Sequence, residues 1–88
     1  MNRQKTVLYI ATRNPLYQEP HWFKEAFERD GIRLIRADEQ ASETENADRA
    51  PDAAAMLVCA GRYAVTAQSF ERLRNCGLVV RMGVGYEM

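Results

Sequence analysis

The sequence predicts an α/β fold with a mostly parallel sheet. Short runs of apolar and β-branched residues, which are typical of buried strands, recur along the chain. Between them lie segments whose apolar residues repeat at helical spacing, with glycines where helices are expected to end. Strands that alternate with helices favour right-handed crossovers, which place the strands parallel to one another.

The first third of the chain is expected to form a strand, a helix and a second strand. Residues 7–11 (VLYIA) are apolar and partly β-branched, so they predict a buried strand. The segment ATRNPLYQEP carries two prolines and indicates a loop, in which Pro20 can open a helix. Gly31 is expected to stop that helix, and residues 32–37 to form the second strand. The apolar residues at helical spacing are Trp22, Phe23, Ala26 and Phe27.

Residues 38–52 (DEQASETENADRAPD) form a distinct acidic segment with almost no large apolar residue. Ser42 and Glu45 have the spacing of a capping box, which indicates a short helix. Two interpretations of the segment remain open. It could be an acidic docking patch, but we favour a solvated connection between the elements on either side.

The second half is expected to repeat the alternation. Residues 55–60 (AMLVCA) form a continuous apolar run, which suits a strand covered on both faces. Thr66 can cap a helix that carries Phe70 and Leu73 on one face and ends at Gly77. Residues 78–82 are the last expected strand.

These elements predict a flavodoxin-like three-layer α/β/α sandwich, forming a single domain over residues 1–88 that we expect to be incomplete. In such sheets, ligands bind beyond the carboxyl ends of the strands. That rule selects the stretches 12–17, 61–66 and 83–87.

Within these stretches, the sharpest feature is Gly83-Val84-Gly85, where two glycines allow positive φ angles and a close approach of a ligand. Successive N–H groups in such a turn can point at an anion, but a lone GxG is a weak signal, and taken by itself it favours a plain turn. Gly61, Arg62 and Tyr63 follow a neighbouring strand and could line the same crevice; the alternative is an exposed Arg and a half-buried Tyr.

Other titratable residues indicate structural roles. Arg81 fits an edge strand, and His21, the only histidine, is expected at a helix start on the end opposite to the ligand-facing loops. Cys59 and Cys76 form no CxxC pair and are interpreted as structural thiols. We find no metal-binding cluster, no Ser-His-Asp set and no GxGxxG fingerprint in the sequence.

Composition excludes several classes of partner. Twelve Lys and Arg balance twelve Asp and Glu, so net charge gives no case for nucleic acid or an anionic membrane. The opening residues lack a long apolar core and a cleavage site, and no stretch approaches the about 20 apolar residues of a membrane span. We therefore expect a cytoplasmic protein.

Two stretches together carry a family resemblance. AAAMLVCAGRYAVTAQSFERL followed by LVVRMGVGYEM resembles the amino-terminal part of the D-isomer-specific 2-hydroxyacid dehydrogenases. In that family an apolar strand leads to a loop and a Val-Thr-Ala helix start, and a later strand ends in Gly-Val-Gly. The matching residues are Val65-Thr66-Ala67 and Gly83-Val84-Gly85-Tyr86. The whole chain shares the pattern of elements, but only residues 53–88 carry specific matches.

The resemblance implies the substrate-binding lobe, or catalytic domain, of an oxidoreductase that uses NAD or NADP. The reaction is hydride transfer between a 2-hydroxy acid and a 2-keto acid. Family knowledge places backbone amides of the glycine loop, here Val84 and Gly85, on the substrate carboxylate, and brings in Gly61, Arg62 and Tyr63 more loosely. The expected partners are this small acid, the absent dinucleotide-binding domain and a second copy of the chain in a homodimer.

The sequence also departs from the family. Glu87-Met88 stands where the family has Asp-Asn. The family's carboxylate-binding Arg, its acid–base His and its glycine fingerprint cannot be mapped onto Arg62, Arg81 or His21, so no catalytic or cofactor-binding residue is assigned. We expect an amino-terminal lobe fragment that is inactive as an isolated 88-residue chain. The alternative is a stand-alone, non-catalytic α/β module that binds a small anion or a protein partner.

Overall fold

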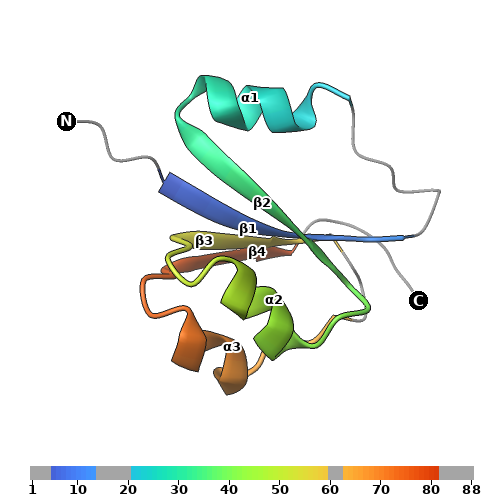
Figure 1. Cartoon of the computed structure of the whole chain (residues 1–88), viewed down its shortest axis with the longest axis vertical. Helices are drawn as coiled ribbons and strands as arrows, with labels where there is room; N and C mark the ends of the chain where they lie inside the picture. The colour runs from blue at the N-terminus through green and yellow to red at the C-terminus, as the bar shows by residue number, and fades with distance from the viewer. Residues whose placement is uncertain (1–4, 14–20, 60–62, 82–88) are drawn as a thin grey trace.

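The fold is an open parallel sheet with helices on both faces (Figure 1). The computed structural model describes residues 5–13, 21–59 and 63–81. The strands are β1 (Lys5–Ala11), β2 (Ile32–Asp38), β3 (Ala55–Val58) and β4 (Leu78–Arg81), and the helices are α1 (Phe23–Arg29), α2 (Glu43–Arg49) and α3 (Ala67–Arg72). Every pairing is parallel and the strand order is β2-β1-β3-β4. The predicted flavodoxin-like α/β fold is confirmed.

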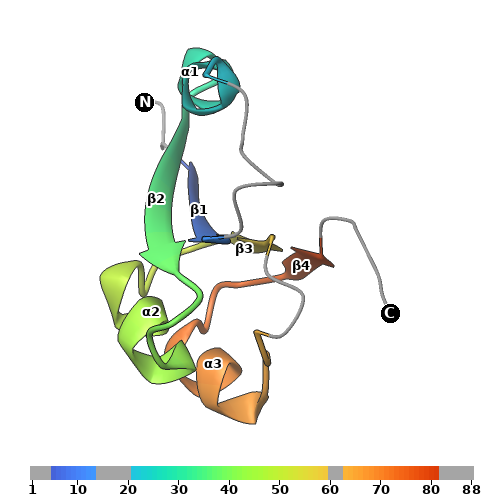
Figure 2. The same ribbon diagram turned by 90° about the vertical axis from the view of Figure 1, so that its right-hand side faces the viewer.

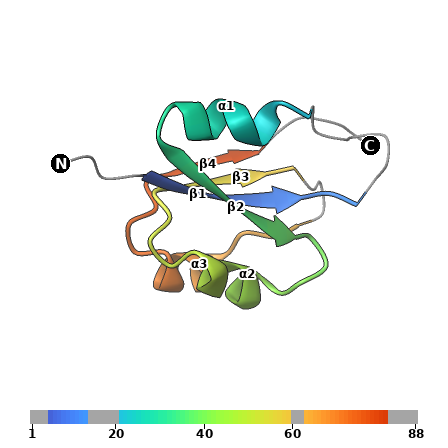
Figure 3. The ribbon, with the colours of Figure 1, turned by 45° about the horizontal axis from the view of Figure 1, so that its top comes forward.

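The central strand β1 carries the core because it pairs with both β2 and β3. Its residues alternate between two apolar clusters, one on each face of the sheet. Leu8 and Ile10 are fully buried under α2 and α3, whereas Val7, Tyr9 and Ala11 face α1. Figures 2 and 3 show α1 on one face and α2 with α3 on the other, which gives the three layers.

Helix α1 is held by two aromatic residues one turn apart. Phe23 and Phe27 pack edge to face, with ring centroids 5.1 Å apart, and Phe23 lies 5.2 Å from the ring of Tyr9. Trp22, predicted on the same face, is instead 53% exposed just before the helix. Gly31 ends the helix as predicted, because its φ of 77° suits a residue without a Cβ.

The acidic segment is more than a solvated connection. Ser42 and Glu45 form the predicted capping box, with the Glu45 N–H donating to Ser42 Oγ at 3.1 Å and the Ser42 N–H donating to Glu45 Oε1 at 3.1 Å. The helix that follows, α2, buries Asn46 and Ala47 completely against the sheet. Our preferred interpretation was wrong on this point, because two small residues suffice to give the helix a buried face.

Helix α3 follows the prediction at its start and departs from it at its end. Thr66 is the N-cap, and its Oγ1 accepts from the Gln68 N–H at 3.2 Å. The helix stops at Arg72, well before Gly77, and the next residue, Leu73, leaves the helical conformation. Leu73 is buried, whereas Phe70 is 43% exposed, so the prediction that they share a face was wrong.

Strand β4 lies at the edge of the sheet, as the interpretation of Arg81 as an edge residue requires. Leu78 is 58% exposed and Val80 39% exposed.

The prediction that His21 lies at the end of the sheet opposite to the ligand-facing loops was wrong. His21 precedes α1, and α1 starts at the end of the sheet where β1 finishes (Figure 1). It must start there because β1 and β2 are parallel, so α1 runs back to the start of β2. Among the described residues, no helix has the length and apolarity needed to cross a bilayer.

Candidate functional site

The carboxyl ends of all four strands meet at one edge of the sheet, because every strand is parallel. They are Ala11, Asp38, Val58 and Arg81. The chain order reverses at β1, since β2 lies on one side of it and β3 on the other. Ligands bind beyond this edge in open parallel sheets, so it is the place to seek a site.

Most of the predicted site residues lie outside the described part of the chain. Gly61 and Arg62 fall in the gap between residues 59 and 63, and Gly83, Val84 and Gly85 follow residue 81, the last one described. Their role in binding stays a prediction. The structure describes one predicted site residue, Tyr63.

Tyr63 lies in the core on the α2 and α3 face and is 8% exposed. Its hydroxyl accepts a hydrogen bond from Asn46 Nδ2 at 3.2 Å, and its carbonyl accepts one from Arg81 Nη2 at 2.9 Å. Burial raises the pKa of the Tyr63 phenol, so it stays neutral. The residue therefore joins α2, the end of β4 and the segment after β3.

Asn46 completes this connection from the side of α2. Its Nδ2 also donates to the carbonyl of Asp38 at 2.8 Å, and its Oδ1 lies 3.5 Å from the Asp38 N–H. One fully buried amide thus links the last residue of β2 to α2 and to Tyr63. This contact fixes α2 relative to the carboxyl edge of the sheet.

Glu43, the first residue of α2, holds the start of α3. Its carboxylate accepts hydrogen bonds from the Thr66 N–H at 2.9 Å, the Thr66 hydroxyl at 2.7 Å and the Ser69 hydroxyl at 2.5 Å. The Ser69 and Thr66 hydroxyls favour the ionised form and lower the pKa of Glu43. The Val-Thr-Ala helix start is therefore anchored by an acid from the acidic segment.

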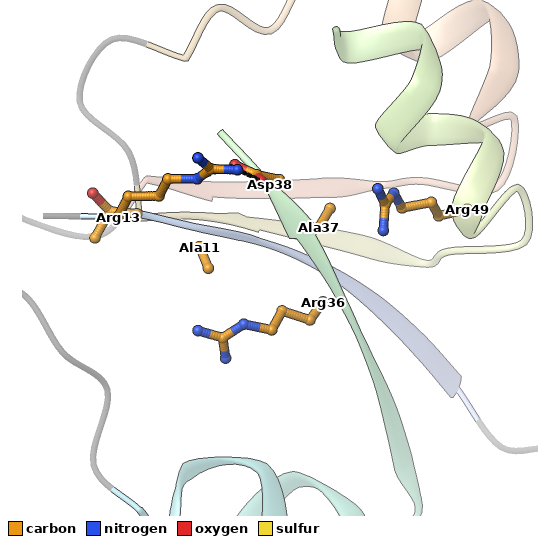
Figure 4. A pocket seen from close by; sticks show the side chains of 7 residues that line it. Ala11, Arg13, Arg36, Ala37, Asp38 and Arg49 are labelled. Atoms are coloured by element: carbon orange, nitrogen blue, oxygen red, sulfur yellow. Dashed lines mark hydrogen bonds and ion pairs between the residues drawn. The ribbon is translucent and has the colours of Figure 1, made fainter. Parts of the chain in front are cut away.

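A pocket of about 310 Å³ opens where β1 and β2 end (Figure 4). Three arginines and one aspartate supply its charged groups, and two alanines supply apolar wall. We call it the arginine pocket. The residues that line it are Ala11, Thr12, Arg13, Arg36, Ala37, Asp38 and Arg49.

Arg13 and Asp38 form an ion pair across the mouth of the pocket. Arg13 Nε donates to Asp38 Oδ1 at 3.2 Å and its Nη2 pairs with the other carboxylate oxygen, a two-point fork. The hydrogen bond from Arg13 lowers the pKa of the Asp38 carboxyl, and the Gln40 N–H adds to the effect. Asp38 therefore remains ionised and holds the Arg13 guanidinium in place.

The other two arginines reach the pocket from different layers. Arg36 projects from β2 on the α1 side, and its Cζ lies 5.5 Å from the centroid of the Tyr9 ring. Arg49 lies in the last turn of α2 and extends toward β2 from the opposite side (Figure 4). Glu39 does not line the pocket; its carboxylate accepts from the Thr12 hydroxyl at 3.1 Å and from the Arg13 N–H.

Sequence reasoning found part of this pocket. Residues 12–17 were selected as ligand-facing, and they include Thr12 and Arg13. Arg36, Asp38 and Arg49 were missed. The alternation of Arg36 and Asp38 with Ala37 at the end of a strand was the available signal, since it places both charges on one face.

Comparison of the chain with protein-family models, with curated proteins and with solved structures finds no match in any of the three. Among the described residues, no group of three or more His, Cys, Asp or Glu side chains could hold a metal ion.

Proposed function

We propose that these residues contribute the substrate-binding lobe of an NAD(P)-dependent D-2-hydroxyacid dehydrogenase. The observation that carries the proposal is the agreement of topology with motif placement. The sheet order is β2-β1-β3-β4, the Val65-Thr66-Ala67 motif lies at the start of α3, and Gly83-Val84-Gly85 follows the end of β4. The resemblance requires both motifs at these positions.

In this proposal the chain binds the acid and leaves the redox step to the cofactor. The backbone amides of Val84 and Gly85 would hold the substrate carboxylate, with Gly83 shaping the turn and Gly61 and Arg62 beside it. Tyr63, the next residue, is buried in the core and would support this segment rather than contact the acid. A nicotinamide supplies the hydride chemistry when bound. It would belong to a dinucleotide-binding domain, because the 88 residues contain no GxGxxG fingerprint.

The size of the binding energy decides what the lobe can do alone. Two charge-assisted hydrogen bonds from amides contribute about 1.5–3 kcal/mol each. The lost translational and rotational freedom costs at least about 4 kcal/mol, so the net affinity is about millimolar at best. We expect the 88-residue chain to bind a 2-keto acid weakly and to be inactive without a nicotinamide site.

The test is a titration of the 15N-labelled chain with pyruvate, followed by NMR. The amides of Val84 and Gly85 should shift with millimolar affinity, and pyruvamide, which lacks the carboxylate, should leave them unchanged. Equal shifts with both compounds would count against the proposal. NADH oxidation with glyoxylate, pyruvate or hydroxypyruvate should stay at background, and measurable turnover would contradict the assignment of hydride transfer to a separate domain.

The second candidate function is a stand-alone, non-catalytic α/β module that binds a small anion. The arginine pocket favours it, because arginines from β2, from α2 and from the segment after β1 line one pocket of this chain. A self-sufficient module should be monomeric and unfold cooperatively, whereas a lobe that needs further segments should associate through exposed apolar surface.

A further inference from the structure

We infer that the arginine pocket binds the phosphate group of a small phosphorylated molecule. The pocket lies at the ends of β1 and β2, whereas Gly83-Val84-Gly85 follows β4, two strands away from β1 in the sheet order. The inference therefore concerns a second site and does not rest on the proposed dehydrogenase function.

The charged groups of the pocket favour an anion. Arg13, Arg36 and Arg49 line it together with one acid, Asp38. The Glu39 carboxylate lies beside it and accepts from the Thr12 hydroxyl and the Arg13 N–H. The protein as a whole has a formal net charge of zero, so three arginines around one pocket are a local concentration of positive charge. A phosphate monoester carries nearly two negative charges at neutral pH, and its oxygens match the planar fork of a guanidinium.

Two of the three arginines are held in place before any ligand arrives. Asp38 fixes the Arg13 guanidinium through its two-point fork, and Arg36 lies against the ring of the buried Tyr9. Arg49 lies on α2, and the hydrogen bond from Asn46 to the carbonyl of Asp38 ties this helix to the end of β2. Groups that are ordered in the free protein lose less entropy on binding, which favours affinity.

The size and walls of the pocket favour a small molecule over an isolated ion. A volume of about 310 Å³ falls at the lower end of the range typical of small-molecule sites. A phosphate group leaves part of it for an attached group. The Thr12 hydroxyl and the methyl groups of Ala11 and Ala37 line the remaining wall, which suits a short polar carbon chain.

The test compares glycerol 3-phosphate with glycerol, inorganic phosphate and acetate in NMR titrations of the whole chain. Glycerol 3-phosphate should shift resonances of the pocket residues, inorganic phosphate should shift the same set more weakly, and glycerol and acetate should not. The Arg49→Gln variant should weaken binding of glycerol 3-phosphate by about tenfold, equal to about 1.4 kcal/mol.

Arg33→Gln provides the matched control, because Arg33 lies on the same strand as Arg36 but near its opposite end and is exposed. It changes net charge as Arg49→Gln does and should leave the affinity unchanged, while circular dichroism confirms that each variant is folded. Equal losses in the two variants, or shifts spread over the whole surface, would reduce the effect to general electrostatics and overturn the inference. An absence of shifts at about 10 mM glycerol 3-phosphate would overturn it too, since even a few ion pairs give millimolar binding.

Discussion

Asn46 shows how one side chain can fix the geometry of the carboxyl edge. Its amide is fully buried and donates to both the Asp38 carbonyl and the Tyr63 hydroxyl. A buried polar group without a partner costs more than its hydrogen bond contributes when made. Removing this amide would therefore take away the donor of the buried Tyr63 hydroxyl and of the partly buried Asp38 carbonyl, and it would loosen α2 from β2.

We expect Asn46→Ala to lower the free energy of unfolding by about 2–3 kcal/mol, because it removes the three hydrogen bonds of this amide and leaves the buried Tyr63 hydroxyl without its donor. Urea unfolding followed by circular dichroism measures the change. Asn75→Ala is the control, since Asn75 is exposed and should change stability by less than about 0.5 kcal/mol. Similar losses in the two variants would show that the amide contributes nothing beyond its size.

Glu43 should make stability depend on pH. Hydrogen bonds from Ser69 and Thr66 lower the pKa of Glu43 below its ordinary 4.5. Hydrogen bonds from Ser42 lower the pKa of Glu45, and the hydrogen bond from Arg13 lowers that of Asp38. Each carboxylate then stabilises the fold fully above its ordinary pKa, and the stabilisation is lost as the pH falls through the lower folded pKa.

The change to test is Glu43→Gln, which should unfold at lower urea concentration at neutral pH and lose less stability between about pH 5 and about pH 3 than the wild type does. Glu71→Gln, at an exposed acid on α3, should keep the wild-type slope. Chemical denaturation at a series of pH values gives both slopes. If Glu43→Gln kept the wild-type slope as well, the carboxylate would not be coupled to folding.

At the scale of elements, α2 depends on its ends and its contacts rather than on an apolar stripe. It has seven residues, far fewer than an isolated helix needs to be stable in water. The capping box satisfies its first turn, Glu43 joins it to α3, and Ala47 and Asn46 bury its inner face. The cap should therefore contribute a large share of the helix's stability.

Ser42→Ala is expected to cost about 1 kcal/mol of stability, the typical value for loss of an N-cap. Amide hydrogen exchange should accelerate in α2 before it does in β1, because the cap acts locally. Ser42→Asp keeps an acceptor at the cap and should retain most of the stability. Exchange that accelerates equally in β1 would mean that α2 does not open separately from the sheet.

The sequence predicted the strands better than the helix faces, and the reason is physical. A strand buried on both faces reads as a continuous apolar run, and β1 and β3 both do. The spacing of Phe70 and Leu73 has meaning only within a continuous helix. Leu73 is the C-cap of α3, with φ of −99° and ψ of 70°, so the helical rule no longer relates their directions.

The arginine pocket was only half predictable for a similar reason. Arg13 lies just past a predicted strand, so a rule about strand ends could select it. Arg49 is 36 residues away in sequence, and it reaches the pocket because α2 packs on the end of β2. That packing depends on Asn46. This residue is polar and lies in an acidic segment, so no hydrophobic pattern in the sequence marks it as buried.

At the scale of the whole molecule, the helices of the described residues leave part of one sheet face uncovered. Strand pairing places Leu78 beside Ala55 and Val80 beside Leu57. Ala55 and Leu57 pack against the apolar cluster under α1, so Leu78 and Val80 lie on the same face of the sheet as α1. Neither Leu78 nor Val80 belongs to the apolar cluster under α1, and both are exposed. Figure 2 shows β4 at the far side of the sheet from α1. In the described part of the chain, β4 pairs with β3 alone.

An exposed apolar edge strand promotes association of copies, because it offers both apolar surface and unpaired backbone groups. We expect sedimentation velocity of the 88-residue chain to show a weight-average mass that rises with protein concentration. Replacing Leu78 and Val80 together by lysine should shift the distribution to monomer, since charges on an edge strand oppose pairing. Phe70→Lys is the control, because Phe70 is a similarly exposed apolar residue on α3, away from this face, and should leave association unchanged. A wild-type chain that stays monomeric over a wide concentration range would show that the face is covered by the chain itself or tolerated in water.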